Sequence, residues 1–190
     1  GKFAGYHEDS FSPAEFDITP LLTTGSNTIA AQIYLFSSAS WLEDQDFWRF
    51  SGIFRNVTLY ALEKTHLEDL RTDTIFSEDL SHAKLEISAL LNGELSNVSA
   101  TAELRDQQEN PVAQISLFQT EHLLTGSLEI SQPILWSAET PYLYKLVITI
   151  RQQDTLIEQS VIAVGLRKFE NCDGLMKINQ KRNILKGVNR

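Results

Sequence analysis

The feature that most limits the fold is a series of short segments between residues 67 and 164 in which apolar and polar residues alternate. A period of two is the pattern of a strand that packs one face on a core and turns the other to water. In residues 83–91, for example, the apolar positions of the alternation are Leu85, Ile87 and Leu90 to Leu91. The expected strands are residues 67–76, 83–91, 97–105, 111–119, 127–130, 144–150 and 155–164.

Turn signals separate these strands. Asn92-Gly93 is a favourable hairpin dipeptide, because both residues tolerate positive φ. At Glu109-Asn110-Pro111 one strand ends and the next begins, which keeps the proline out of a strand centre. About seven short strands joined by polar turns, within about a hundred residues, indicate an immunoglobulin-like β-sandwich.

The first sixty residues contain further strand-like segments and no long helix. Residues 28–36 are almost continuously apolar, which predicts a strand buried on both faces. Residues 55–61 alternate, and Leu21-Leu22 before residues 23–27 indicates one helical turn followed by a tight turn. Because residues 62–66 are polar without periodicity, we place a domain boundary there.

Composition excludes several classes of protein. A formal net charge of −9 argues against a nucleic-acid partner, since that affinity depends on clustered Lys and Arg. No apolar run is long enough to span a membrane. A single cysteine, Cys172, excludes an internal disulfide and a cysteine-built zinc site, and it is compatible with the cytoplasm. The absence of an initial Met and an apolar segment at the C-terminal end lead us to expect a piece of a longer protein.

The stretch from Trp41 to Arg55 has the composition of a binding site. Three carboxylates (Glu43, Asp44 and Asp46) stand within four residues, and the stretch also contains two tryptophans and three phenylalanines. Consecutive acids do not suit a core strand unless they are paired or ligated, so we expect a polar pocket with aromatic walls, as in a sugar or cation site. The alternative is that Arg49 and Arg55 pair with the acids and the aromatics fill a core.

This stretch also carries a resemblance. LEDQDFWRFSGIFRNV, residues 42–57, is similar to the LEDQDxWRxSGIFRxV signature of glycoside hydrolase family 2 in its large bacterial β-galactosidases. A second block, LWSAETPYLY at residues 135–144, resembles the LWSxExPxLY segment of the same family. The family often has Gln where Glu8 stands and Asp where Ser38 stands, so an ion site that uses those two positions is not expected here.

The resemblance implies an all-β chain of three parts. Residues 1–62 correspond to the C-terminal part of a jelly-roll, galactose-binding-like sugar-binding domain, and residues 63–167 to the immunoglobulin-like β-sandwich. Residues 168–190 correspond to a linker and the first strand of a catalytic TIM barrel, with a hairpin turn at residues 178–182. Residues 184–188 could instead form a further strand of the sandwich.

The resemblance also implies a function for the longer protein. It would hydrolyse terminal β-D-galactosides such as lactose by a retaining mechanism, with two glutamates that lie in the barrel beyond Arg190. We therefore expect no catalytic residue here and no hydrolase activity. Asp46 matches the family aspartate that reaches the barrel's active site, so it is the expected substrate-binding residue and sodium ligand, and the barrel supplies the remaining ligands.

Several further expectations follow from the resemblance. The whole enzyme would use sodium and magnesium, and this chain alone would hold neither. Its partners would be the galactoside, the barrel, the C-terminal domains and further copies in a homo-oligomer, with no nucleic acid and no membrane. The resemblance favours a β-galactosidase over a β-glucuronidase or a β-mannosidase as the longer protein, because the motif LEDQDxW is of the galactosidase type. The competing class is a free-standing carbohydrate-binding or adhesive β-sandwich without catalysis.

Other residues are assigned structural roles. Glu43 and Asp44 are expected to pair with Arg49 or Arg55, and Trp136 to be a core or inter-domain anchor. The histidines have no metal-ligand spacing and are expected at the surface or in turns: His7, His66, His82 and His122.

Overall fold

The structure is a computed structural model, and it describes residues 1–9, 11–42, 52–184 and 187. The chain divides into two compact units, Gly1–Tyr60 and Ala61–Arg190, and each is described by itself.

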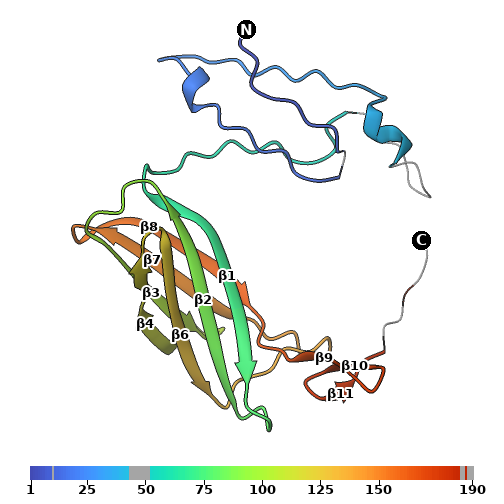
Figure 1. Cartoon of the computed structure of the whole chain (residues 1–190), viewed down its shortest axis with the longest axis vertical. Helices are drawn as coiled ribbons and strands as arrows, with labels where there is room; N and C mark the ends of the chain where they lie inside the picture. Colours follow the sequence, from blue (N-terminus) through green and yellow to red (C-terminus); the bar gives the residue numbers. More distant parts are fainter. Residues whose placement is uncertain (10, 43–51, 185–186, 188–190) are drawn as a thin grey trace. The chain divides into compact units, whose positions relative to one another are not determined.

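The second unit contains the β-sandwich (Figure 1). One four-stranded antiparallel sheet has the order β1-β2-β6-β5, and the other has the order β4-β3-β7-β8. The predicted all-β sandwich is therefore confirmed. The strands are β1 (His66–Phe76), β2 (His82–Asn92), β3 (Val98–Arg105), β4 (Pro111–Ser116), β5 (Phe118–Thr120), β6 (Leu123–Ser131), β7 (Tyr144–Gln152) and β8 (Thr155–Val164).

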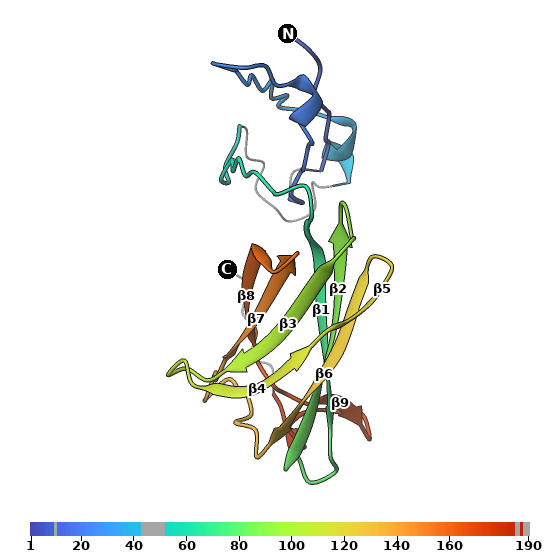
Figure 2. The ribbon, with the colours of Figure 1, turned by 90° about the vertical axis from the view of Figure 1, so that its left-hand side faces the viewer.

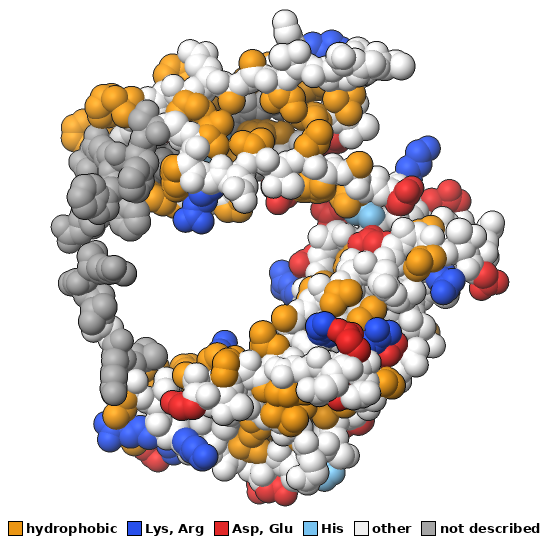
Figure 3. All heavy atoms as spheres, turned by 180° about the vertical axis from the view of Figure 1, so that it is seen from behind, with side chains coloured by type: hydrophobic (Ala, Val, Ile, Leu, Met, Phe, Trp, Pro, Cys, Tyr) orange, Lys and Arg blue, Asp and Glu red, His pale blue; other side chains and the backbone are white. Residues whose placement is uncertain are grey.

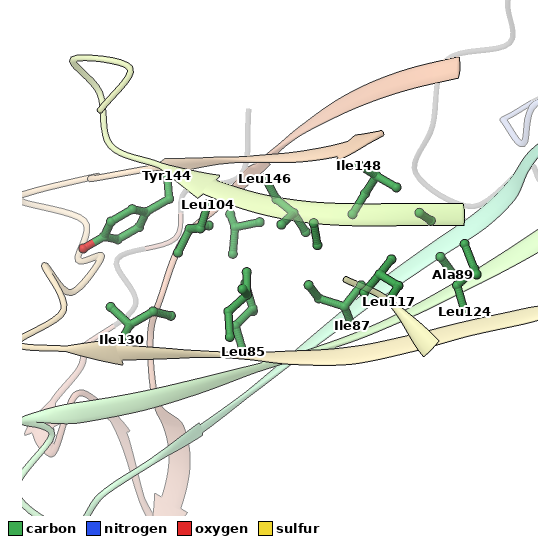
Figure 4. Packing of buried hydrophobic residues seen from close by; sticks show 14 of the residues in the cluster. Leu85, Ile87, Ala89, Leu104, Leu117, Leu124, Ile130, Tyr144, Leu146 and Ile148 are labelled. Atoms are coloured by element: carbon green, nitrogen blue, oxygen red, sulfur yellow. The ribbon is translucent and has the colours of Figure 1, made fainter. Parts of the chain in front are cut away.

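The alternation in the sequence becomes the core of the sandwich. Leu85 and Ile87 on one sheet meet Leu104, Leu146 and Ile148 on the other, as Figure 4 shows. All five are buried, and burial of one such side chain stabilises the fold by about 1.5–3 kcal/mol. In β2 and β3 the intervening residues are more exposed, which is the arrangement that a period of two requires.

One predicted strand is divided in the structure. Residues 111–119 were expected as a single strand, but β4 ends at Ser116 in one sheet and β5 begins at Phe118 in the other. Between them Leu117 is buried, and its backbone N–H donates a 2.8 Å hydrogen bond to the carbonyl of Ala100. The chain thus closes one side of the sandwich by crossing between the sheets (Figure 2).

The role predicted for Asn92-Gly93 is wrong. β2 and β3 belong to different sheets, so these residues begin a crossing rather than a hairpin. Gly93 has a φ of 100°, and a Cβ placed on it would lie 2.0 Å from the carbonyl oxygen of Lys64. The prediction for Pro111 is confirmed, because that residue begins β4 and β4 pairs with β3.

A separate three-stranded sheet follows the sandwich. It has the order β11-β10-β9 and consists of β9 (Phe169–Cys172), β10 (Leu175–Ile178) and β11 (Lys181–Arg182). The predicted hairpin turn is confirmed, with Asn179 and Gln180 at φ values of 51° and 65°. Residues 185, 186 and 188–190 lie outside the described part of the chain, so neither expectation for residues 184–188 is tested.

The first unit differs from the prediction. Its described residues include two short 3₁₀ helices, η1 (Thr19–Leu21) and η2 (Ser38–Trp41), but no strand. η1 and the following turn match the expectation, since the Asn27 side chain bonds to both N–H and C=O of Thr23, at 2.9 and 2.7 Å. The strands expected at residues 28–36 and 55–61 are absent.

The reason for that difference is the lack of pairing partners. Residues 28–36 were expected to be buried, yet Ile29, Ile33 and Tyr34 are exposed. A strand needs a hydrogen-bonded neighbour for its backbone and a packed layer for its side chains, and no residue described in this unit pairs with the segment in a ladder. Hydrophobic side chains consequently lie on the surface of this unit (Figure 3).

Candidate functional site

The predicted site residue Asp46 lies outside the described residues, together with Glu43, Asp44 and Arg49. The pairing expected between these acids and the arginines is therefore untested. The described flanks of the stretch are Trp41 and Leu42, which are exposed, and Gly52 to Arg55. The Arg55 guanidinium lies 5.7 Å from the centre of the Phe54 ring, within the range of a cation–π contact.

Aromatic and polar contacts connect distant segments of the same unit. Phe54 also packs on Phe11, with ring centres 6.2 Å apart and planes inclined by 60°. The carboxylate of Glu8 accepts hydrogen bonds from the hydroxyls of Tyr6 and Ser38, and Ser38 is 30 residues away in the chain. The two positions that depart from the family pattern, Glu8 and Ser38, are thus direct partners here.

These hydrogen bonds affect the ionisation of the acids. The Ser38 hydroxyl, and then that of Tyr6, lower the pKa of Glu8, while Glu8 raises the pKa of Tyr6. The Ser12 hydroxyl and the backbone N–H groups of Phe11 and Ser12 lower the pKa of Asp9 to about 2. Glu8 and Asp9 therefore stay ionised at neutral pH, and each already has hydrogen-bond donors from its own unit.

The described residues do not assemble a metal centre. They contain no group of three or more His, Cys, Asp or Glu side chains that could hold a metal ion. His7, His82 and His122 are exposed, as predicted. The prediction for His66 is wrong, because its side chain is only 14% exposed. It lies at the start of β1, where Nδ1 is 2.7 Å from the carbonyl of Glu63 and Nε2 is 3.2 Å from Glu68.

The second motif block forms a junction within the sandwich unit. The backbone N–H of Trp136 donates to the carbonyl of Leu166 at 2.9 Å, and the Arg167 guanidinium lies 4.6 Å from the centre of its ring. A Cβ on Gly165 would lie 3.2 Å from the same ring. Trp136 is thus an anchor between the segment before β7 and the segment after β8.

The same block is tied to β7 by Tyr144. The backbone N–H of Ile134 donates a 2.8 Å hydrogen bond to the Tyr144 hydroxyl, and Tyr142 packs edge-on against the Tyr144 ring at 5.0 Å. Burial raises the pKa of Tyr144, so its phenol stays neutral and keeps this contact. Tyr142 and Tyr144 of the second motif block therefore have a packing role within the sandwich unit.

The small sheet is attached to this junction through Asn179. Its side chain accepts a 3.0 Å bond from the Lys168 N–H and donates a 3.0 Å bond to the Trp136 carbonyl. The neighbouring Gln180 side chain donates to the carbonyl of Glu78, in the turn between β1 and β2. Sequence reasoning identified the turn at Asn179 but not these contacts, because the partners are remote in the chain.

Comparison with known proteins identifies two parts of the chain. Residues 1–63 match the family described as "Glycosyl hydrolases family 2, sugar binding domain", and residues 65–167 match "Glycosyl hydrolases family 2". In the part of the chain that the structure describes, no helix is long and apolar enough to cross a membrane.

Curated relatives align with the whole chain. Proteins named β-galactosidase from Clostridium acetobutylicum, Lactobacillus delbrueckii subsp. bulgaricus and Halalkalibacterium halodurans are 44%, 43% and 42% identical to it. The alignments cover 100% of this chain but only 21%, 19% and 19% of those proteins. The chain therefore spans about a fifth of the length of these relatives.

Solved structures support the fold. A β-glucuronidase from Parabacteroides merdae is 23% identical, with a TM-score of 0.59 over 67% of this chain and 16% of that one. The Ruminococcus gnavus β-glucuronidase in complex with D-glucuronic acid is 21% identical, with a TM-score of 0.57 over 67% and 20%. With two family profiles covering residues 1–63 and 65–167, the chain belongs to glycosyl hydrolases family 2.

Proposed function

We propose that this chain is a non-catalytic part of a longer β-galactosidase. The observation that carries the proposal is the alignment of the whole chain, at 42–44% identity, with three proteins named β-galactosidase. The motif LEDQDFW at residues 42–48 also favours a β-galactosidase. A free-standing binding module is disfavoured, because the alignment with such an enzyme covers 100% of this chain, including both family regions.

We propose that the longer protein hydrolyses terminal β-D-galactosides such as lactose, with both catalytic glutamates in a barrel that follows this chain. We further propose that it is a cytoplasmic homo-oligomer that uses sodium and magnesium. Retaining hydrolysis needs two carboxyl groups about 5 Å apart, and the proposal assigns neither of them to this chain. The role of the chain is to support the barrel and to complete its substrate site.

Asp46 is the residue proposed to complete that site. Its carboxylate is a hard oxygen donor, which suits sodium, and it can also accept a hydrogen bond from a sugar hydroxyl. Two other acids of the first unit, Glu8 and Asp9, already accept hydrogen bonds from donors of that unit. In this role Asp46 holds the galactosyl hydroxyl at C6 and orients the substrate toward the glutamates.

The sandwich is proposed to support the barrel through the small sheet. Asn179 and Gln180 attach β10 and β11 to the sandwich at two separated points, the Trp136 carbonyl and the Glu78 carbonyl. These two contacts fix the small sheet on the sandwich. We propose that residues 168–190 are the linker and the first barrel strand. The contacts of Asn179 and Gln180 support this role because they attach the linker to the sandwich.

The test uses Asp46→Ala in the longer protein. The proposal expects a higher KM for a nitrophenyl β-galactoside and a weaker dependence of the rate on sodium. Glu139→Ala, an exposed carboxylate of the second motif block, is the control and should change neither. An unaltered sodium response in the Asp46 variant would refute the assignment of this residue. A longer protein that hydrolyses no β-galactoside would refute the proposed function itself.

A further inference from the structure

The outer face of the sheet β1-β2-β6-β5 carries an ordered set of side chains that the proposed function does not use. In this sheet β1, β2 and β6 lie side by side (Figure 1). The strand register places the outward side chains in rows across these strands. One row joins the paired residues Arg71, Ser88, Thr125 and Phe118, and the next joins Asp73, Glu86 and Ser127. Residues in register on one face of a sheet are direct neighbours.

The sizes of these side chains produce a groove, which we call the outer trough. Its floor is formed by the small residues Ser88, Thr125 and Ser127 at the centre of the sheet. Phe118 stands at one end of the row on the short edge strand β5, and charged residues of β1 and β2 stand at the other end. The cavity volume is about 580 Å³, and the trough is open to solvent.

The charges that line the outer trough balance. Arg71 and Lys84 contribute two positive charges, and Asp73 and Glu86 contribute two negative ones. Lys84 is paired with Glu86 at 2.8 Å. A groove with no formal net charge does not favour a phosphate or a metal ion, so the lining suits a neutral polar ligand.

Hydrogen-bonding capacity and an exposed ring are available in the same place. Among the described residues, the hydroxyls of Ser88, Thr125 and Ser127 have no side-chain hydrogen-bond partner. Each hydroxyl can donate one bond and accept others. Phe118 is 71% exposed, although an aromatic ring of its size is stabilised by burial. A ligand that covers Phe118 while it bonds to hydroxyls needs both an apolar face and many hydroxyl groups.

We propose that the outer trough is a binding site for a neutral saccharide, formed by residues of the sandwich and not by Asp46. A pyranose ring has a face of C–H groups that can pack on Phe118. Its edge of hydroxyls can bond to the serines and threonine of the floor and to the free carboxylate oxygens of the wall. The site lies in the sandwich, outside residues 1–63 that match the sugar-binding domain, and it does not depend on the identity of the longer protein.

The test is a titration of the ¹⁵N-labelled 190-residue chain with lactose, cellobiose and, as a charged probe, galacturonic acid. The proposal expects saturable shifts of the amide signals of Ser88, Thr125 and Ser127 with at least one disaccharide, and weaker shifts with the acid. Phe118→Ala should weaken that binding about tenfold, the loss of about 1.4 kcal/mol of stacking.

A matched control is available in the same chain. Phe169 on β9 is 60% exposed and lies outside the outer trough, so Phe169→Ala should leave the affinity unchanged. Ser127→Gln, which places a longer side chain on the floor, should block binding without removing the aromatic ring. The proposal is overturned if neither disaccharide gives saturable shifts at the trough, or if Phe169→Ala weakens binding as much as Phe118→Ala.

Discussion

The side-chain amide of Asn179 donates a 3.0 Å hydrogen bond to the backbone carbonyl of Trp136, 43 residues earlier in the chain. The backbone N–H of Asn179 also donates to the carbonyl of Lys168 at 2.8 Å. Its φ of 51° is a conformation that asparagine adopts more readily than most residues. One residue thus forms a turn and attaches the small sheet to the sandwich.

Replacing Asn179 with Ala is expected to release the small sheet. The change removes two side-chain hydrogen bonds and places a less suitable residue at positive φ, so it should destabilise the sheet by about 1–3 kcal/mol. Hydrogen exchange should show faster exchange in β9 and β10 and little change in β2 and β7. Asn171→Ala, on the exposed part of β9, is the control, and equal exchange rates in both variants would contradict the role of Asn179.

Replacing Gly93 with Ala is expected to destabilise the sandwich more than the same change at Gly174. Both glycines have positive φ, 100° and 71°, so both variants carry backbone strain of about 1–2 kcal/mol. At Gly93 the new Cβ would also lie 2.0 Å from the Lys64 carbonyl oxygen, whereas nothing lies within 4 Å at Gly174. Urea unfolding should therefore show the larger loss for Gly93→Ala by about 2 kcal/mol or more.

Equal losses at the two glycines would show that Gly93 is required only for its backbone angle. The contact between the new Cβ and the Lys64 carbonyl would then relax at little cost.

Asp79 is expected to make stability depend on pH in the acid range. The hydroxyl groups of Ser77 and Ser81 and the Ser81 N–H hold its pKa at about 2, below the ordinary value of 3.8. Because the pKa is lower in the folded chain, the stabilisation is present above about pH 4. It is lost as the pH falls toward 2, where the folded chain also takes up the proton.

The measurement is the urea midpoint of the wild-type chain and of Asp79→Asn between pH 6 and pH 2. The wild-type chain should be the more stable at pH 6, and the difference should shrink as the pH falls to 2. Asp73→Asn, on the outer face of β1, removes a carboxylate without touching the turn and serves as the control. A difference that stays constant down to pH 2 would rule out this ionisation effect.

The sequence predicts the sandwich well because the apolar–polar alternation of a strand can be recognised from the residues of that strand alone. β2 and β3 alternate between buried and more exposed positions, and that alternation depends only on residues within each strand. The division of residues 111–119 at Leu117 could not be predicted, since a buried residue in a crossing looks like a buried residue in a strand. The contacts of Asn179 and Gly93 likewise depend on partners far away in the chain.

At residues 28–36 the sequence pattern predicts a strand that the structure does not have. The composition of this segment predicts a buried strand, but burial and pairing require other segments, and the described part of the first unit provides none. For the candidate site, the sequence predicted Asp46 from a resemblance and not from geometry. That assignment stays a prediction, because residues 43–51 lie outside the description of the structure.

The most direct test of the account is the hydrolysis of a nitrophenyl β-galactoside by the purified 190-residue chain and by the longer protein that contains it. The account predicts no turnover above a matched control for the chain alone and clear turnover for the longer protein. Turnover by the chain alone would contradict the assignment of catalysis to the barrel, and its absence in the longer protein would contradict the proposed β-galactosidase activity.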